Sequence, residues 1–586
     1  MSDQTTQPMA ASPATASPKE KHASDSDGTA GAASLPETKP PLVPEVDQPA
    51  AKGWKFWMVF PPLCVATLLM ALESTVTSTA LPEIAAALNS GDNYVWFLNG
   101  YLLTATIFLP LYGQFADVFG RRWPTIFGVA VFTLGSGISG GAQSTGAMIA
   151  GRLVQGLGAA GITSMTQIIV GDLVPARERP KHMGVVFAVF GVGTALGPPV
   201  GGVIVAHDWR WVFWLNLPVG AVTLVMQFLF LKVAYVKRAT LRERVRSIDW
   251  LGNVLLGASV VAVLIALSWA DVRYPWSSWR VIVPLVVGFA GFLGFHLYEM
   301  SPWCAPVPAI APYMWASRAS AVGLVLSFLQ SMLIYWRTYF LPLYFQAVLL
   351  ASPARSGVLL LPTILMGIPA AIIGGGWLSR SGRYKPIHFF GFASTALATG
   401  LYIDLGKDSS LAKVVLYQIV CGLGGVLLSA MVPAIQAAHP QSRVAAATST
   451  WNFYRSFGAI WGIAIPATVF NSRMAAEVQA RVSDAKVRAL IGSGDAYARV
   501  SSAFISSLPE PVQSQVVDAY RETLRLVWIV CLAFSVLALL LVFAEPEIPL
   551  KETLVSDYQL EGARKSQDDK EAAVATPPSG LEAEAK

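Results

Sequence analysis

Residues 113–122 read GQFADVFGRR, and residues 375–383 read GGWLSRSGR. Both stretches follow a long apolar segment, and both have glycine at the first and eighth positions and arginine at the ninth. They begin 262 residues apart, and a second pair of strings, QGLG at 155–158 and CGLG at 421–424, lies 266 residues apart. Two nearly equal offsets indicate that the chain consists of two repeats in the same orientation.

Apolar segments long enough to cross a membrane surround these stretches. About 20 residues of helix span the roughly 30 Å of hydrocarbon in a bilayer. We count fourteen such segments, at residues 57–81, 95–112, 124–142, 148–170, 183–205, 211–233, 250–269, 281–297, 319–345, 357–378, 387–405, 414–436, 446–470 and 526–543. The sequence therefore predicts an all-α integral membrane protein with 14 transmembrane helices, in two parallel six-helix halves with two inserted central helices.

The composition excludes several classes of function. Charged residues make up 13% of the 586 residues, about half the share expected of soluble proteins, so a chain of several soluble domains is excluded. The four cysteines and six histidines are scattered, which indicates neither a disulfide framework nor a metal site. The string GLGAAG at 156–161 lies inside an apolar segment, so it indicates helix packing rather than dinucleotide binding. We expect no catalytic centre, no cofactor and no nucleic-acid partner.

The basic residues of the short loops predict the orientation. If the N-terminus is cytoplasmic, the inside segments carry 18 Lys and Arg and the short outside loops carry six, so both termini are predicted inside. Apolar positions within the long outside loop 471–525, such as Met474, Val478 and Val482, predict a short amphipathic helix on the surface. The predicted parts are a disordered cytoplasmic tail 1–53, an N-terminal half 54–233, a basic linker with two extra helices 234–300, a C-terminal half 301–543 and a disordered cytoplasmic tail 544–586.

Four motifs carry a resemblance to a known family. They are LESTVTSTALP at 72–82, GQFADVFGRR at 113–122, MIAGRLVQGLGAA at 148–160, and a glycine pattern of Gly184, Gly193, Gly197, Pro198, Gly201 and Gly202. With them the chain resembles the fourteen-helix drug:proton antiporter branch of the major facilitator superfamily, most closely its fungal members. The resemblance covers nearly the whole chain between the tails. It implies export of small amphipathic molecules in exchange for protons, by alternating access.

Residues 113–122 resemble the family's loop motif between the second and third helices. Gly113 and Gly120 allow a tight reversal of the chain. Asp117 can accept from a helix N-terminus or pair with an arginine, which would make a latch that breaks when the halves move. Alternatively, Arg121 and Arg122 are ordinary basic anchors at the cytoplasmic membrane surface.

Glu73 and Arg152 are the candidates for proton coupling. Both are ionisable residues in apolar segments, where charge is costly and usually functional. Burial would raise the pKa of Glu73, so that it could take up and release a proton, and the resemblance assigns Arg152 to proton transfer. The alternatives are a permanently ionised Glu73 that pairs with an arginine for structure, and an Arg152 that snorkels to the interface from near its helix start.

The glycine pattern resembles the fifth-helix motif that marks exporters in this family. Glycines four apart allow close helix packing, and Pro198 removes one backbone donor. Packing without functional meaning is the alternative. For the substrate cavity the candidates are polar or cationic residues within the segments: Asn99, Gln155, Gln330, Tyr335, Arg337, Asn452 and Arg455. We expect the titrating groups to be concentrated in the N-terminal half and the C-terminal half to select the substrate.

The sequence thus predicts a proton-coupled efflux transporter for drugs, toxins or secondary metabolites. Its partners would be a small-molecule substrate, protons and the lipid bilayer, and it would act as a monomer in the plasma membrane, or alternatively in the vacuolar membrane. Two other functions stay open: a carrier for one natural product or siderophore, and a membrane sensor that does not transport.

Overall fold

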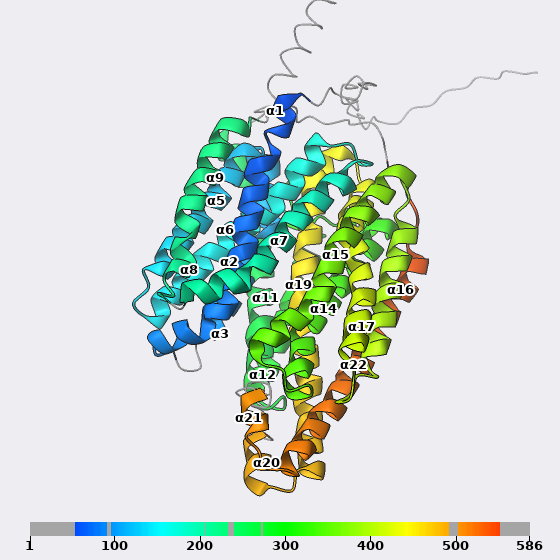
Figure 1. Ribbon diagram of the computed structural model, residues 1–586. Helices are drawn as coiled ribbons and strands as arrows, with labels where there is room; N and C mark the ends of the chain where they lie inside the picture. The colour runs from blue at the N-terminus through cyan, green and yellow to red at the C-terminus, as the bar shows by residue number, and fades with distance from the viewer. Residues whose placement is uncertain are drawn as a thin grey trace, which may run out of the picture. The chain divides into compact units, whose positions relative to one another are not determined.

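The computed structural model describes residues 53–90, 95–205, 207–232, 240–270, 274–491 and 502–550. Almost all of the predicted N-terminal tail, and the C-terminal tail from residue 551, lie outside these ranges. Within them, every regular element is a helix (Figure 1). The absence of strands agrees with the all-α prediction.

The first half of the chain contains nine helices in the described residues: α1 (Trp54–Trp57), α2 (Phe60–Ala87), α3 (Val95–Ile107), α4 (Leu109–Phe119), α5 (Arg122–Gly140), α6 (Thr145–Leu173), α7 (Arg179–Val205), α8 (Trp211–Trp214) and α9 (Asn216–Phe230). The connecting part contains α10 (Leu241–Ser247), α11 (Trp250–Trp269), α12 (Trp279–Glu299) and α13 (Tyr313–Ala316). The second half contains α14 (Arg318–Ala347), α15 (Pro353–Ser381), α16 (Lys385–Tyr402), α17 (Leu411–Leu423), α18 (Leu427–Ala437), α19 (Val444–Arg481), α20 (Ala485–Ile491), α21 (Ser502–Ser506) and α22 (Val512–Ala544), with short 3₁₀ turns on either side of α18.

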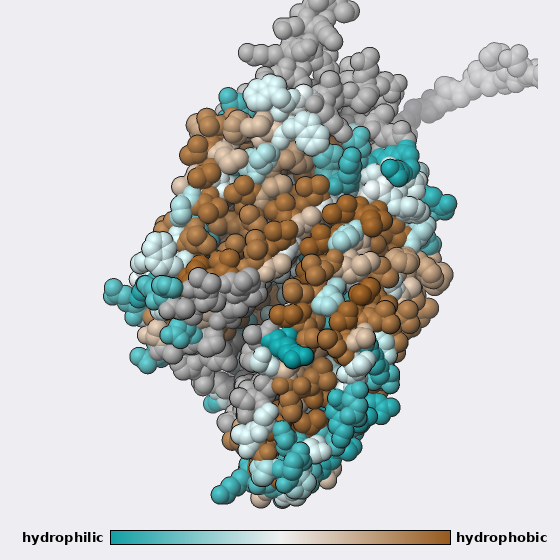
Figure 2. Space-filling model, in the orientation of Figure 1, coloured by the Kyte–Doolittle hydropathy of each residue, from teal (hydrophilic) through white to brown (hydrophobic). Residues whose placement is uncertain are grey.

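Each of the fourteen predicted segments coincides with one of these helices or with a pair of consecutive ones. In the described part of the chain, nine helices are long and apolar enough to cross a membrane, or ten if the bent pair α3 and α4 is one span. The protein is therefore a multi-pass membrane protein, while the count of fourteen crossings stays a prediction. Figure 2 shows hydrophobic residues over the middle of the visible face and hydrophilic residues towards its ends, as a bilayer requires.

Close backbone contacts fix the pairing of helices. In the first half α2 packs against α7 and α5 against α6, and in the second half α14 packs against α19. A Cβ atom on Gly458 would clash with the carbonyl oxygen of Phe328, and one on Gly462 with that of Met332. Because both helices advance by four residues between these contacts, α14 and α19 run parallel and in register. The halves meet where α4 contacts α19 and α7 contacts α15.

Helix α19 is longer than the sequence predicted. The expected span ends at residue 470, but the helix continues to Arg481. Met474 and Val478 are fully buried, and the Thr523 hydroxyl lies 3.5 Å from the sulfur of Met474. The prediction of a surface helix here was wrong, because these apolar residues face α22 rather than the membrane surface.

The segment after α22 is also ordered at its start. The prediction placed a disordered tail from residue 544, but residues 545–550 pack against the N-terminal end of α16 and form what we call the strap. The Tyr384 hydroxyl donates to the carbonyl of Pro546 at 2.6 Å, and the amide of Leu550 donates to the carbonyl of Gly382 at 3.4 Å. The tail's first residues therefore belong to the folded body.

Candidate functional site

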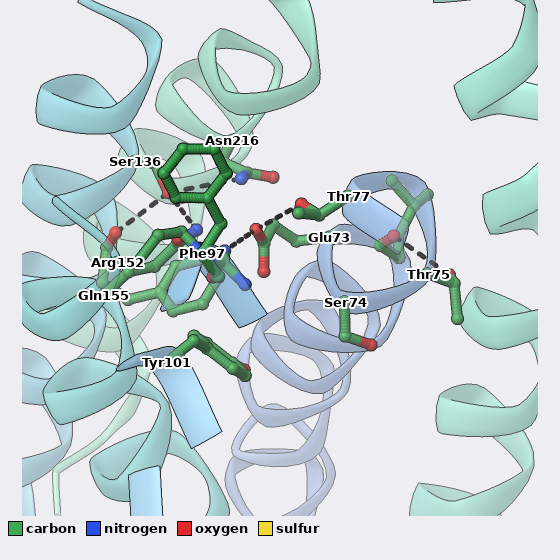
Figure 3. A network of polar contacts seen from close by, with 12 residues as sticks. Glu73, Ser74, Thr75, Thr77, Phe97, Tyr101, Ser136, Arg152, Gln155 and Asn216 are labelled. Atoms are coloured by element: carbon green, nitrogen blue, oxygen red, sulfur yellow. Dashed lines mark hydrogen bonds and ion pairs between the residues drawn. The ribbon is translucent and has the colours of Figure 1, made fainter. Parts of the chain in front are cut away.

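A buried ion pair joins α2 to α6 in the first half (Figure 3). Glu73 is 0% exposed and Arg152 is 1% exposed, and Nη1 of Arg152 pairs with Oε1 of Glu73. The same carboxylate oxygen accepts from the Thr77 hydroxyl at 2.8 Å. Nε of Arg152 donates to the carbonyl of Phe97 at 2.7 Å. The arginine therefore lies in the interior and does not snorkel to the interface.

Amides and a hydroxyl extend this pair into a network. Nη1 of Arg152 donates to Oε1 of Gln155 at 2.6 Å, and the amide nitrogen of Gln155 donates to the Ser136 hydroxyl at 2.9 Å. Asn216 on α9 donates to the same hydroxyl at 3.2 Å. The ring of Tyr101 lies 4.5 Å from the guanidinium carbon of Arg152. Five helices, α2, α3, α5, α6 and α9, thus hold one charge pair.

One oxygen of the pair is unsatisfied. Oε2 of Glu73 is buried and has no hydrogen-bond partner among the described residues. An ionised carboxylate in a low-dielectric interior is stabilised by its cation and its donors, and a vacant oxygen can accept a proton. The pair therefore keeps one acceptor atom that the described residues leave open.

The predicted latch is built around Arg121. Its Nε donates to Asp172 at 2.7 Å, and its Nη1 lies 3.4 Å from Asp117. Arg121 also donates to the carbonyl of Ala116. Asp172 was missed because the predicted span ended at residue 170, whereas α6 continues to Leu173. The sequence offered only one indication of this partner, namely that Asp172 is an acidic residue just beyond the predicted end of the span.

The other latch residues occupy different places. Gly113 lies against α19, since a Cβ atom there would clash with the Ser449 hydroxyl. Gly120 ends α4 with φ 81°, a conformation that glycine adopts without strain. Arg122 lies apart from the cluster and donates to the carbonyl of Phe228 at 2.8 Å. Arg122 is thus a surface anchor in this structure.

Two arginines at the start of α7 join the halves. Arg177 donates to the carbonyls of Ser379 at 2.8 Å and Arg380 at 2.6 Å, at the C-terminal end of α15. Arg179 donates to the side chains of Gln436 at 2.9 Å and Gln441 at 2.6 Å. The sequence analysis counted these arginines only as inside charges. The structure adds that they bridge the two repeats.

The model of the Major Facilitator Superfamily matches residues 63–463, which is more than half of the chain. This chain belongs to the major facilitator superfamily. It is 45% identical to the MFS-type transporter gkaD of Penicillium citrinum over 525 residues, 89% of each chain. It is 41% identical to the efflux pump FUS6 of Gibberella fujikuroi over 517 residues, 88% of this chain and 93% of that one.

A solved structure of the same superfamily has the same fold. The proton:xylose symporter XylE, bound to 6-bromo-6-deoxy-D-glucose, aligns with a TM-score of 0.55 over 85% of this chain and 97% of its own length. Its sequence identity of 12% makes this a likeness of fold alone. The family resemblance is confirmed. The protein is a membrane transporter that takes small-molecule substrates and is not an enzyme.

In this superfamily member the exporter-type glycines pack α7 on two sides. A Cβ atom on Gly184 would lie 3.6 Å from the Cα atom of Ile372 on α15. Cβ atoms on Gly193 and Gly197 would press on α2, the latter clashing with the Thr75 hydroxyl. Gly201 is buried, while the surroundings of Pro198 and Gly202, which belong to α7, lie outside the described side chains.

The candidate cavity residues are not all brought together. Gln155 belongs to the Glu73 network, and Asn452 bridges the halves by donating to Gln167 on α6 at 3.1 Å. Asn99 on α3 is partly exposed. Arg337 is separate, with a buried Nη1 that has no partner in the described structure. Gln330, Tyr335 and Arg455 lie on α14 and α19.

The second half contains a buried titratable pair that the sequence analysis missed. His388 Nδ1 lies 2.8 Å from Glu545 Oε2, and both side chains are at most 1% exposed. Glu545 had been assigned to the tail, and His388 had been counted among scattered histidines. The strap thus returns an acid to α16 and adds one buried pair to the second half, while the expected concentration of titrating groups in the first half stays a prediction.

A further cluster of possible metal ligands lies at the ends of α11 and α12. The ligand atoms of Asp249, Glu299 and Cys304 all lie within 4.8 Å of one another. Glu299 Oε1 already accepts from the amides of Ala309 at 2.8 Å and Ile310 at 3.1 Å. Burial, then the nearby Glu299 carboxylate, raises the pKa of the Cys304 thiol to about 12. Cys304 Sγ also donates to Glu299 Oε2 at 3.3 Å, so Glu299 anchors the linker to the end of α12.

Proposed function

We propose that this transporter exports small amphipathic organic molecules, such as drugs, toxins or secondary metabolites, in exchange for protons. The direction rests on the exporter-type glycines of α7 and on relatives whose names describe efflux pumps. The proton coupling rests on one observation, the buried Glu73–Arg152 pair with its unpartnered Oε2. The energy suffices, because one proton moving down 100 mV supplies about 2.3 kcal/mol and each pH unit about 1.4 kcal/mol.

Protonation of Glu73 would act through Arg152. While Glu73 is ionised, Arg152 and Thr77 hold it and tie α2 to α6. A proton on Glu73 removes the negative charge, so Arg152 keeps only its neutral acceptors, Phe97 and Gln155. The two protonation states thus favour different arrangements of α2, and α2 packs against α7. A change at the pair can therefore alter the contact of α7 with α15 in the other half.

The latch would hold one of the two alternating states. Arg121 binds Asp172 and Asp117 where α4 meets α19, and Arg177 and Arg179 bind the second half beside it. We propose that these bonds close the cytoplasmic end of the bundle and break when the protein opens inward. In this proposal residues 54–233 and 301–543 move as two bodies, and 234–300 connects them.

The 18 to 6 distribution of basic residues supports a topology with both termini in the cytoplasm. We propose the plasma membrane as the location, with the vacuolar membrane as the alternative, and a monomer as the working unit. Neither choice alters the coupling proposal.

The test is cellular accumulation of a panel of amphipathic compounds in yeast lacking its own drug pumps. Cells carry the native chain, Glu73→Gln or Glu83→Gln, each with and without a protonophore. Glu83 is a matched control because it lies on the same helix and is exposed. We expect the native chain and Glu83→Gln to lower accumulation several-fold. Glu73→Gln or the protonophore should abolish the effect, because glutamine cannot exchange a proton.

Two outcomes would favour the other functions. An effect on a single compound would indicate a narrow-specificity carrier, and no effect by a correctly localised protein would favour a sensor. Export by Glu73→Gln at the native rate, still sensitive to the protonophore, would remove Glu73 from the coupling step.

A further inference from the structure

Arg455 is a cation that has no counter-charge among the described residues, and it lies in the part of α19 that the sequence predicts to cross the membrane. None of its guanidinium nitrogens makes a hydrogen bond or ion pair within the described residues, and its side chain is partly exposed. Its guanidinium carbon lies 5.5 Å from the centroid of the Trp451 ring, a contact that does not cancel the charge. By contrast, Arg121 and Arg152 each have a carboxylate partner. An isolated arginine in a membrane interior costs at least about 2.5 kcal/mol, so an anion should stabilise it.

A second donor without a partner among the described residues lies on the neighbouring helix, α14. Nε1 of Trp451 donates to the Ser327 hydroxyl at 2.9 Å, which fixes α19 beside α14 at this point. By the contacts of Gly458 with Phe328 and of Gly462 with Met332, Gln330 lies between these two contacts on α14, and Arg455 lies about one turn before the first of them on α19. Gln330 is 4% exposed, and its buried amide nitrogen has no hydrogen-bond partner in the part of the chain that the structure describes. A guanidinium on a long side chain and an amide donor thus lie on two packed helices, about one and a half turns apart along them.

Tyr335 connects this pair of donors to the first half. Its phenol lies close enough to Arg455, and to Tyr101 on α3, to form part of the electrostatic surroundings of both. Tyr101 in turn covers the guanidinium of Arg152. The ring of Tyr335 stacks on that of Tyr339 with centroids 6.3 Å apart, and both side chains are partly exposed. The donors therefore lie beside aromatic surface and towards the Glu73–Arg152 pair.

We propose that Arg455 and Gln330 bind an ionised carboxylate of the transported molecule, so that the substrates are amphipathic organic anions. The planar guanidinium can donate two parallel bonds to a carboxylate, and the Gln330 amide adds a third donor. The tyrosine rings provide apolar surface for the body of the molecule. This inference rests on the proposed transport function, and it assigns recognition of the charged group to the second half.

The test measures binding to the purified full-length protein in detergent, without a pH gradient. The probes are 1-pyrenebutyrate and its methyl ester, which differ only in the charge of the acid group. We expect the native protein to bind the acid about tenfold or more tighter than the ester, which corresponds to about 1.4 kcal/mol or more. Arg455→Gln should bring the acid to about the affinity of the ester and leave the ester unchanged, while Arg455→Lys should retain part of the preference.

Arg337→Gln is the matched control, because Arg337 is a second cation without a carboxylate partner but lies elsewhere on α14. It should leave the acid preference intact. If Arg455→Gln does not fold, Gln330→Leu is the second variant, because leucine is similar in size to glutamine but has no amide donor. It should weaken binding of the acid and leave binding of the ester unchanged. Equal affinity for the two probes, no binding of either, or equal loss of both in Arg455→Gln would overturn the inference.

The outcome is separable from that of the proposed function. Acid-selective binding that depends on Arg455, without any efflux in cells, would support the anion site and contradict proton-coupled export. Protonophore-sensitive efflux of neutral compounds, by a protein that does not prefer the acid probe, would support proton-coupled export and contradict the anion site.

Discussion

At the scale of single residues, Gly197 on α7 makes a very close contact with Thr75 on α2. Any side chain at Gly197 would clash with the Thr75 hydroxyl, which itself donates to the carbonyl of Ala71 at 3.1 Å. We expect Gly197→Ala to destabilise the protein by about 1–3 kcal/mol, as overpacking does. Gly184→Ala on the same helix has space, with its nearest atom at 3.6 Å, and should be neutral or slightly stabilising.

Thermal unfolding of the two variants in detergent measures this difference. An equal effect of both would mean that the glycines act through helix propensity and not through close packing. The motif would then carry no steric meaning at Gly197.

The sequence identified charged residues in apolar segments but could not pair them. Glu73 and Arg152 stood out because charge is rare in a membrane interior, yet they are 79 residues apart, and only helix packing decides that they meet. Gln155, also predicted, joins the same network. Asp172 was lost through a boundary error of about one helical turn, and Glu545 because the return of the strap has no local signal.

At the scale of elements, the strap depends on one buried pair. Glu545 Oε2 lies 2.8 Å from His388 Nδ1 in a site closed to solvent. We expect Glu545→Gln to destabilise the protein by about 1–3 kcal/mol, because buried polar partners lose a charge-assisted bond. Glu547→Gln changes the same group two residues later, where the partner Arg383 is exposed, and should have no measurable effect.

Thermal unfolding, followed with a fluorescent label at residue 550 of the strap, measures both variants. If Glu545→Gln unfolds like the native protein, the strap is held by its backbone bonds and by Tyr384 rather than by the pair.

Helix positions were the best predicted elements, because a run of apolar residues is a strong local signal. All fourteen predicted segments are helical. The helix ends were less predictable where packing overrides local composition, as in α19, whose buried Met474 and Val478 continue the helix against α22. The break between α3 and α4 was also unpredicted, since the residues on both sides are apolar.

At the scale of the whole molecule, charged side chains connect the two halves near the arginine-rich ends of α4 and α7. This holds for the side chains that the structure describes. Arg177 and Arg179 contact the second half there, and α7 continues along α15 past Gly184. In an alternating-access cycle these contacts must separate once per turnover. Holding them together should therefore stop transport without affecting the fold.

A disulfide between Gly184→Cys and Ile372→Cys tests this in a variant whose four native cysteines are serine. The Cβ position at 184 lies 3.6 Å from the Cα atom of Ile372, so the backbones of α7 and α15 approach closely at this pair. We expect oxidation to reduce efflux to the level of cells without the protein, and a reductant to restore it. The two single cysteine variants should export normally in both conditions. Undiminished efflux by fully cross-linked protein would mean that α7 and α15 move together, and that the halves separate along a different pair of helices.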